Sequence, residues 1–332
     1  MIDLSTKYLG IPLKNPLVAS ASPLSEKIEN IKQMEKSGIA AVVLHSLFEE
    51  QVILQEKELN NALTQQTESY AESLSYFPDI DDYRFAPDEY VEYIAKVKKA
   101  LDIPVIGSLN GISQGGWIRY GKQIEQAGAD ALELNIYYLP TDVMDSCQKI
   151  EQIYLDLVSV LRQNISIPIA VKLNPYFNSI PGIINKIAKE GADGLVLFNR
   201  FYQPDIDLNE LSVTPHLSLS HSQELKFRLR WVAIMYQRVQ ADFAITGGIH
   251  TVEDIIKSML VGANITMMAS VLLEKGIPYV KELLKGIEEW MRRNNYHSIR
   301  QIQGLLSQKN IKEPAAFERA NYMKVLQSYH LE

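Results

Sequence analysis

The stretch GADGLV at residues 191–196 decides the fold predicted for this chain of 332 residues. Its glycine is typical of a helix end in the left-handed backbone region, and the small residues that follow allow a strand to start directly beneath. Similar stretches occur at residues 38–43 (GIAAVV), 128–133 (GADALE) and 262–267 (GANITM). We therefore expect one structural unit, a helix followed by a strand, to repeat along the chain.

Eight apolar runs are nearly continuous in hydrophobicity, which is typical of parallel strands covered on both faces. The predicted strands are residues 17–20, 40–45, 105–110, 131–136, 169–174, 194–199, 243–249 and 265–270. Helical spacing separates them at residues 26–36, 87–100, 117–126, 143–162, 181–189, 224–240 and 252–260. A doubly wound sheet would account for five or six strands, so eight units favour an α/β protein with a single (β/α)8 TIM barrel over residues 1–332.

The composition limits the classes of function. There are 33 Lys and Arg against 40 Asp and Glu, a net charge of −7, and no basic cluster, so nucleic acid is an unexpected partner. No stretch has the roughly 18 apolar residues of a membrane span. The single cysteine, Cys147, permits no internal disulfide and is expected to be a buried apolar residue. We expect a cytoplasmic protein. We also expect no metal site, because the histidines are not spaced from carboxylates as metal ligands would be.

Two segments extend the minimal barrel. Residues 47–86 separate the second strand from its helix, and they are rich in Glu and Gln and then in aromatic residues. Such a loop is expected to be a lid or binding element over the active face, with an oligomer contact as the alternative. Residues 296–332 are expected to form a C-terminal helical extension that serves packing or dimerisation.

Polar residues close the predicted strands. Catalytic groups of a barrel project from the carboxyl ends of its strands. As a set, these side chains favour a site lined with hydrogen-bond donors and acceptors, which suits a planar heterocycle. They are Ser20, Ser22, His45, Ser46, Ser108, Asn110, Asn135, Lys172, Asn174, Asn199, Thr246, Gly247, Gly248, Ala269 and Ser270.

The last two strands end in a pattern typical of phosphate binding. Thr246 and two glycines close the seventh strand, and Ala269 and Ser270 close the eighth. Glycines at these ends allow backbone N–H groups to approach phosphate oxygens. We expect a phosphate on the ligand or cofactor, with a plain tight turn as the alternative.

Two titratable side chains at strand ends are candidates for a chemical role. Lys172 follows a buried apolar run, where an unpaired ammonium would be costly. It could stabilise negative charge on a cofactor ring, form a Schiff base or pair with Glu133 on the neighbouring strand. His45 could titrate near neutral pH or simply be hydrogen-bonded.

Together, these features resemble the dihydroorotate dehydrogenase-like FMN flavoproteins, in particular the class 1 enzymes and the pyrimidine-handling domain of dihydropyrimidine dehydrogenase. The resemblance covers nearly the whole chain. The resemblance rests on residues 15–22 (NPLVASAS), 134–135 (LN), 171–176 (VKLNPY), Asn199, 247–249 (GGI) and 269–270 (AS).

The resemblance implies FMN as cofactor and a role for each matching residue. Lys172 would reach the pyrimidine edge of the isoalloxazine ring and stabilise anionic reduced flavin, so the resemblance favours that role over a Schiff base. The phosphate would be held by Gly247, Gly248, Ala269 and Ser270, and the flavin would be lined by Ala21, Ser46 and Asn135. Asn135 and Asn199 would bind the substrate pyrimidine. We add Ser108 to the cofactor set and Asn110 to the substrate set.

Three departures from the family pattern bear on the chemistry. The family places a Cys or Ser base after the fourth strand, whereas residues 135–141 here are NIYYLPT, with Tyr138 near that position. A phenol of pKa about 10 is a poor base but a serviceable proton donor, which favours the reductive direction. His45 stands where the family usually has Lys, and residues 219–222 (LSHS) lack the glycine of the family.

The resulting hypothesis is an FMN-dependent oxidoreductase that transfers hydride between flavin N5 and a CH–CH or C=C bond of dihydroorotate or a related pyrimidine. Tyr138, Lys172 and His45 are the predicted catalytic residues. The alternatives are an ene-reductase acting on another unsaturated carbonyl compound, a phosphate-binding barrel lyase using Lys172, and a barrel that binds its ligand without turnover. A homodimer is expected from the resemblance alone.

Overall fold

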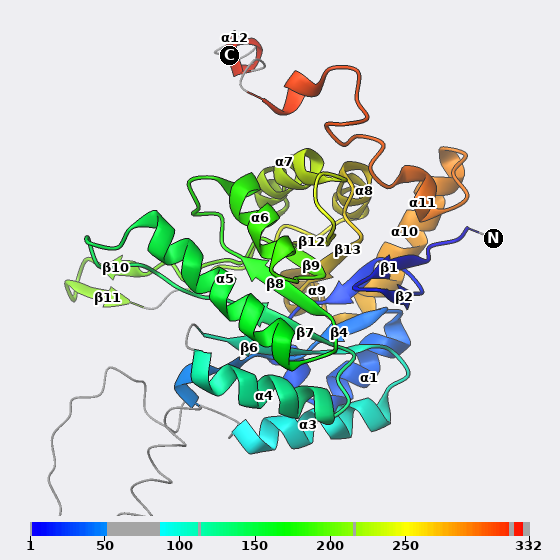
Figure 1. Ribbon diagram of the computed structural model, residues 1–332. Helices are drawn as coiled ribbons and strands as arrows, with labels where there is room; N and C mark the ends of the chain where they lie inside the picture. The colour runs from blue at the N-terminus through cyan, green and yellow to red at the C-terminus, as the bar shows by residue number, and fades with distance from the viewer. Residues whose placement is uncertain (1, 52–86, 112–113, 215–216, 319–321, 328–332) are drawn as a thin grey trace, which may run out of the picture.

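The computed structural model describes residues 2–51, 87–111, 114–214, 217–318 and 322–327 (Figure 1). Within these residues, eight parallel strands form a closed barrel in the order β4-β3-β13-β12-β9-β8-β7-β6, and pairing of β4 with β6 completes the circle. The short strand β5 (Leu47–Phe48) continues the edge beside β6. The barrel strands are β3 (Leu17–Ala19), β4 (Ala41–Val43), β6 (Val105–Asn110), β7 (Ala131–Asn135), β8 (Ile169–Leu173), β9 (Gly194–Leu197), β12 (Asp242–Thr246) and β13 (Ile265–Met268). The predicted TIM barrel is confirmed.

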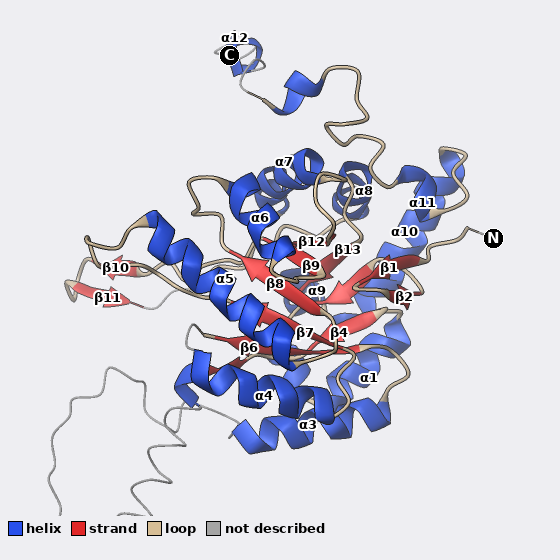
Figure 2. Cartoon of the chain, viewed as in Figure 1, coloured by secondary structure: helices blue, strands red, loops and turns tan. Residues whose placement is uncertain are grey.

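Helices surround the barrel, as Figure 2 shows. They include α1 (Ile28–Ser37), α3 (Pro87–Ala100), α4 (Gln114–Gln126), α5 (Cys147–Asn164), α6 (Ile180–Lys189), α7 (Leu225–Met235), α8 (Val252–Val261), α9 (Ser270–Lys275) and α10 (Val280–Arg293). All four glycines of the repeated stretch have positive φ, between 92° and 114°: Gly38, Gly128, Gly191 and Gly262. Gly38 and Gly262 are the left-handed C-caps of α1 and α8, as predicted, whereas Gly128 and Gly191 come two residues after α4 and α6 end.

The third residue of the repeated stretch explains why the pattern recurs. The backbone N–H of Asp193 donates to the carbonyl of Ile169 at 2.9 Å, and the Asp193 carboxylate accepts from the Ile169 N–H at 2.8 Å. The same reciprocal pair joins Asp130 to Val105 and Asn264 to Phe243. These three pairs fix β9 against β8, β7 against β6 and β13 against β12 at their amino ends.

A short N-terminal hairpin, which the sequence did not predict, packs against the inside of the barrel. It consists of β1 (Thr6–Tyr8) and β2 (Ile11–Leu13). Tyr8, Leu9 and Leu13 are buried in one cluster with inward-facing strand residues such as Val18 and Val196. A larger apolar cluster lies between the strands and the surrounding helices.

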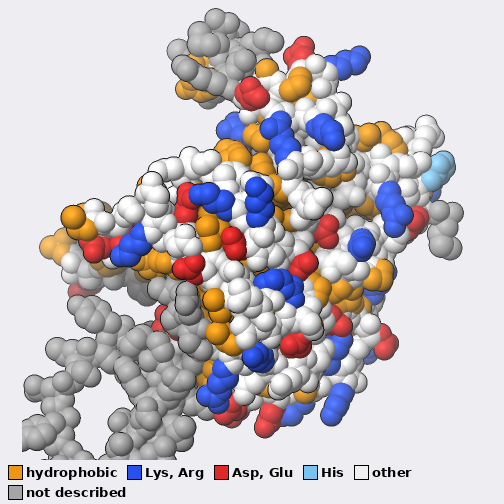
Figure 3. All heavy atoms as spheres, viewed as in Figure 1, with side chains coloured by type: hydrophobic (Ala, Val, Ile, Leu, Met, Phe, Trp, Pro, Cys, Tyr) orange, Lys and Arg blue, Asp and Glu red, His pale blue; other side chains and the backbone are white. Residues whose placement is uncertain are grey.

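A second unpredicted hairpin projects from the barrel between β9 and α7. It pairs β10 (Asp205–Asp207) with β11 (Ser212–Thr214). Several of its apolar side chains are largely exposed, and Figure 3 shows hydrophobic side chains gathering over this hairpin and the loop that leads into α5. The exposed residues on the hairpin are Ile206, Leu208, Leu211 and Val213.

The two predicted extensions are described only in part. Of residues 47–86, the stretch 52–86 lies outside the described residues, so the predicted lid stays a prediction. The chain after α10 contains the short helices α11 (Ile299–Ile302), η5 (Pro314–Phe317) and α12 (Tyr322–Gln327). Among the residues that the structure describes, no helix is both long enough and apolar enough to cross a bilayer.

Candidate active site

Two adjoining cavities open at the carboxyl ends of the barrel strands. The larger, of about 610 Å³, is lined by Ala21, Ser22, Pro23, Glu26, His45, Ser46, Phe48, Glu50, Gln51, Asn110, Asn135, Lys172 and Asn199. The smaller, of about 130 Å³, is lined by Lys172, Phe198, Asn199, Arg200, Ser220, Thr246, Gly247, Ile249, Met267, Met268, Ala269 and Ser270. Lys172 and Asn199 line both cavities, so a single elongated ligand could contact both.

Lys172 lies at the junction of the two cavities. It stands near the end of β8, and its ammonium group is 3.3 Å from the carboxylate of Glu133 on β7. Both side chains are buried, and Glu133 is completely enclosed. The pairing of Lys172 with Glu133, one of the three alternatives for this lysine, is thus present, and Lys172 also lines the ligand space.

Asparagine amides line the inner wall of the larger cavity. The amide nitrogen of Asn199 donates to the side-chain oxygen of Asn135 at 2.7 Å. Asn110 is the register partner of Asn135 on the adjacent strand, so these amides come from neighbouring strand ends. Asn174, in contrast, lines neither cavity and donates to the Tyr154 hydroxyl at 2.7 Å.

Two serines connect the cavity wall to the core behind it. The hydroxyls of Ser46 and Ser108 are 2.8 Å apart, and Ser46 lines the larger cavity. Ser108 is fully buried, and its backbone exchanges hydrogen bonds with the Tyr90 hydroxyl. Ser108 therefore supports Ser46 from behind.

Gly247 lines the smaller cavity, and Gly248 follows it in the same turn without lining the cavity. Gly247 and Gly248 have φ of 82° and 80°, a conformation that L side chains rarely adopt. A β-carbon on Gly248 would lie 2.7 Å from the backbone nitrogen of Leu225, so only glycine fits there without displacing backbone. The turn at Gly247 and Gly248 thus brings the backbone close to the smaller cavity.

Hydroxyl groups complete the wall of the smaller cavity. The Gly248 N–H donates to the Ser220 hydroxyl at 3.1 Å, and the hydroxyls of Ser220 and Ser270 are 2.9 Å apart. Ser220 belongs to the segment that lacks the glycine of the family pattern. Ala269 and Ser270 line the cavity as expected, whereas the participation of Ser220 was not predicted.

A guanidinium also borders the smaller cavity, and sequence reasoning missed it. Arg200 lies 3.2 Å from Glu224, which is 3.9 Å from Arg228. Arg228 is buried beneath Gly247 and donates to the Thr246 carbonyl. The charges of Arg200, Glu224 and Arg228 sum to +1. The position of Arg200 directly after a strand-end asparagine was a signal that could have revealed it.

His45 lines the larger cavity and contacts two aromatic rings. Its ring centroid is 5.0 Å from that of Tyr90, in an edge-to-face arrangement, and 5.6 Å from that of Tyr93. Burial lowers the pKa of His45 from its ordinary value of 6.5, although the nearby Glu26 carboxylate opposes the shift. Burial therefore favours the neutral form of the imidazole.

Tyr138 is partly buried outside both cavity walls. Its hydroxyl donates to the Asp145 carboxylate at 3.1 Å. Partial burial and this carboxylate raise the pKa of Tyr138, so the phenol keeps its proton. The prediction that Tyr138 donates a proton to substrate would require its hydroxyl to leave Asp145 and turn toward the cavity.

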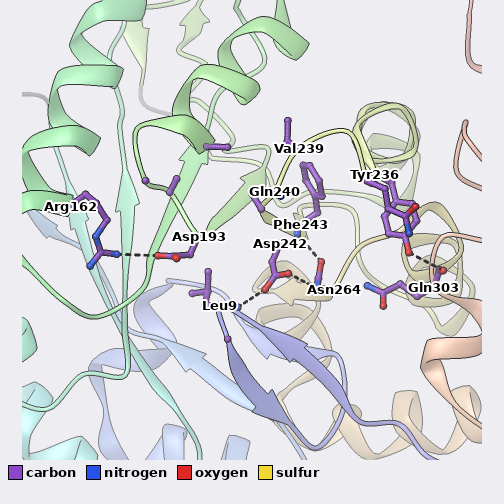
Figure 4. A pocket seen from close by; sticks show the side chains of 16 residues that line it. Leu9, Arg162, Asp193, Tyr236, Val239, Gln240, Asp242, Phe243, Asn264 and Gln303 are labelled. Carbon is purple, nitrogen blue, oxygen red and sulfur yellow. Dashed lines mark hydrogen bonds and ion pairs between the residues drawn. The ribbon is translucent and has the colours of Figure 1, made fainter.

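A different cavity, of about 740 Å³, lies at the amino ends of the strands (Figure 4). Its polar side chains serve the framework: Arg162 pairs with Asp193 at 3.2 Å, and Asp242 accepts from the Leu9 N–H at 2.7 Å and from Asn264 at 2.9 Å. Although this cavity is larger, we place the candidate active site at the carboxyl ends of the strands. There, not all of the side chains are engaged in hydrogen bonds or ion pairs that hold the strands in place.

One expectation about Cys147 is wrong. The residue is exposed at the start of α5 instead of buried, and its sulfur accepts a hydrogen bond from Asn178 at 2.9 Å. The helix begins later than its pattern suggested, which leaves Cys147 on the first, exposed turn.

The fold and the paired cavities define a (β/α)8-barrel protein with a ligand site at the carboxyl ends of its strands. A family model described as dihydroorotate dehydrogenase matches residues 86–291, more than half of the chain. The chain therefore belongs to the dihydroorotate dehydrogenase family. It is an oxidoreductase of the type that acts on CH–CH bonds, and the enzymes of this family are flavoproteins.

Individual relatives match across most of the chain. The catalytic subunit of dihydroorotate dehydrogenase B (NAD(+)) from Thermoplasma acidophilum is 26% identical over 318 residues, 92% of this chain and 99% of the relative. The subunit of the same name from Methanocaldococcus jannaschii is 24% identical, over 91% of this chain and 97% of its own. Escherichia coli NAD-dependent dihydropyrimidine dehydrogenase subunit PreA is 21% identical, over 91% of this chain and 76% of its own.

Proposed function

We propose that this protein is an FMN-dependent oxidoreductase that moves hydride between the flavin and a carbon–carbon bond of a pyrimidine-like ring. The observation that carries the proposal is the joining of a phosphate-sized cavity to a larger amide-lined cavity through Lys172 and Asn199. FMN, when bound, supplies the hydride donor or acceptor.

The smaller cavity fits the phosphate of FMN in size and in chemistry. Its wall combines Gly247 with the hydroxyls of Ser220 and Ser270, and hydroxyl and backbone N–H groups are common phosphate ligands. The net positive charge of the Arg200, Glu224 and Arg228 group favours an anion at this position.

The larger cavity fits a heterocyclic ring and its substrate. Each asparagine amide offers both a donor and an acceptor, which is what the alternating N–H and C=O groups of a pyrimidine require. We assign substrate binding to Asn110, Asn135 and Asn199, and flavin contacts to Ala21, Ser46 and Asn135, with Ser108 orienting Ser46. Lys172, held by Glu133, would offset negative charge on the bound flavin ring.

For proton transfer, we propose His45 before Tyr138, because His45 belongs to the wall of the larger cavity and Tyr138 does not. The imidazole of His45 lines the substrate cavity, and burial favours its neutral form, so it can accept a proton when a ring CH–CH bond is oxidised, provided that the ring turns to bring one of its two buried nitrogens to the cavity. Tyr138 remains the proposed donor for the reductive direction, provided that its hydroxyl is released from Asp145. The lyase alternative is set aside because the family consists of oxidoreductases.

The test is an absorption spectrum of the purified protein after incubation with FMN, followed by anaerobic addition of dihydroorotate or dihydrouracil. A flavin spectrum that either compound bleaches supports the proposal. A flavin spectrum that neither bleaches supports the ene-reductase alternative or a barrel that only binds its ligand. Protein that takes up no FMN contradicts the proposal. The homodimer and the cytoplasmic location stay predictions.

A further inference from the structure

A buried arginine holds the last peptide of β12 from behind the smaller cavity. We propose that Arg228 is a positioning residue, which directs the N–H of Gly247 into that cavity so that it donates to an oxygen of a phosphate group. This inference deepens the proposed function and rests on it for the identity of the phosphate as part of FMN. It gives a role to a side chain that is not itself part of the cavity wall.

Arg228 reaches the turn from α7. Its side chain is buried, its Nε donates to the Thr246 carbonyl, and a terminal nitrogen donates to the Glu224 carbonyl at 2.7 Å. A β-carbon on Gly247 would lie 2.7 Å from the other terminal nitrogen, so the guanidinium lies directly against this glycine. The Glu224 carboxylate is 3.9 Å away. Among the described residues, Arg228 therefore donates to carbonyl oxygens and not to a carboxylate.

The geometry of the peptide bond decides where the Gly247 N–H points. The peptide between Thr246 and Gly247 is trans, and in a trans peptide the C=O and the N–H point in opposite directions. Because the Thr246 carbonyl is directed at Arg228, the Gly247 N–H is directed away from the guanidinium. Gly247 lines the smaller cavity and Arg228 does not, so the side away from Arg228 is the side of the cavity.

The two N–H groups of the turn differ in what they can bind. The Gly248 N–H already donates to the Ser220 hydroxyl at 3.1 Å. The Gly247 N–H, in contrast, has no acceptor among the residues that the structure describes. A charged donor on the carbonyl of a peptide polarises that peptide and strengthens its N–H as a donor. Gly247 is thus the residue of this turn whose N–H can bind an anionic oxygen, and Arg228 both directs and strengthens it.

The first experiment observes the Gly247 amide directly. Thr246 and Gly247 form the one Thr-Gly step in the sequence. Threonine labelled at its carbonyl carbon and glycine labelled at its nitrogen therefore give one carbonyl-coupled amide signal in the NMR spectrum. FMN should move this proton signal downfield, and riboflavin, which lacks the phosphate, should move it less. Inorganic phosphate added to the protein without flavin should move it in the same direction as FMN does.

The second experiment changes the arginine. In fluorescence titrations of the apoprotein, Arg228→Met should weaken binding of FMN by at least about tenfold and that of riboflavin by less than about twofold. Arg228→Lys keeps the charge and should recover part of the preference for FMN. Arg230→Met, at an exposed position on the same helix, is the matched control and should change neither the preference nor the Gly247 signal.

Three results would overturn the inference. One is a Gly247 signal in the unaltered protein that responds to neither FMN nor inorganic phosphate, and this result decides the matter even if Arg228→Met does not fold. The others are an unchanged preference for FMN in Arg228→Met and an equal loss of affinity for both flavins, which a purely structural role would give. Protein that takes up no flavin, but whose Gly247 signal responds to inorganic phosphate, would contradict the proposed cofactor and support the inference.

Discussion

The ammonium group of Lys172 on β8 lies 3.3 Å from the carboxylate of Glu133 on β7, and the two side chains form a buried ion pair beneath the candidate active site. Strand register creates this pair. Asn135 is opposite Lys172 and Glu133 is opposite Ala170, so the lysine and the glutamate are diagonal neighbours on one face of the sheet. One buried pair thus serves both the barrel and the ligand site.

Replacing Lys172 by Met should lower the free energy of unfolding by about 3–5 kcal/mol, because the Glu133 carboxylate would remain buried without its partner. Adding Glu133→Gln should recover much of that loss. Urea unfolding of the single and double variants measures both effects. In the reconstituted protein, Lys172→Met should also make the flavin midpoint potential more negative. An unchanged potential would argue against a flavin contact.

Gly248→Ala should prevent tight FMN binding and destabilise the fold. The new β-carbon would meet the Leu225 backbone nitrogen at 2.7 Å, in addition to the cost of a positive φ. Gly10→Ala is the matched control, since Gly10 has a φ of 78° with nothing near its missing β-carbon. That control should lose only about 1 kcal/mol. Equal losses in thermal unfolding for the two variants would contradict the steric argument.

Arg200→Gln should weaken FMN binding by about tenfold, which corresponds to about 1.4 kcal/mol. It should barely change binding of riboflavin, which lacks the phosphate. Fluorescence titration of the apoprotein with the two flavins measures the ratio. Arg230→Gln, at an exposed position on α7, should preserve the preference for FMN. A preference that survives in Arg200→Gln would place the phosphate elsewhere.

The pH dependence of turnover should reveal His45. A lowered pKa means that the neutral, proton-accepting form predominates above pH 6.5 and is lost as the pH falls through the lowered value. The acid limb of kcat/KM for ring oxidation should therefore have its midpoint below 6.5. His45→Gln should reduce turnover by about 100-fold. If Tyr138→Phe gives the larger loss instead, Tyr138 is the group that transfers the proton.

Asp193→Ala should destabilise the barrel by about 1–3 kcal/mol, because the Ile169 N–H would lose its acceptor. Asp193→Asn keeps an acceptor oxygen, as Asn264 does for Phe243, and should cost less than about 1 kcal/mol. Thermal unfolding of the two variants distinguishes them. Similar losses in both would mean that the exposed ion pair with Arg162 matters more than the hydrogen bond.

Most of the fold could be predicted because its signals are local. A continuous apolar run such as residues 169–173 indicates a strand covered on both faces, and Gly191 marks the turn before the next strand. Eight such helix and strand units predict a closed barrel, and a closed barrel places Lys172 and Asn199 at the carboxyl ends of its strands. The two hairpins escaped prediction because strands of three residues are too short for periodicity to show.

The sequence by itself thus determined the barrel and the set of polar residues at the carboxyl ends of its strands, because hydrophobic periodicity and glycine caps act over a few neighbouring residues. Only the tertiary structure decided which of these side chains share a cavity. Arg200 and Ser220 join the smaller cavity, whereas Tyr138 turns to Asp145. These outcomes depend on contacts between residues far apart in the chain, whose geometry is set only when the barrel closes.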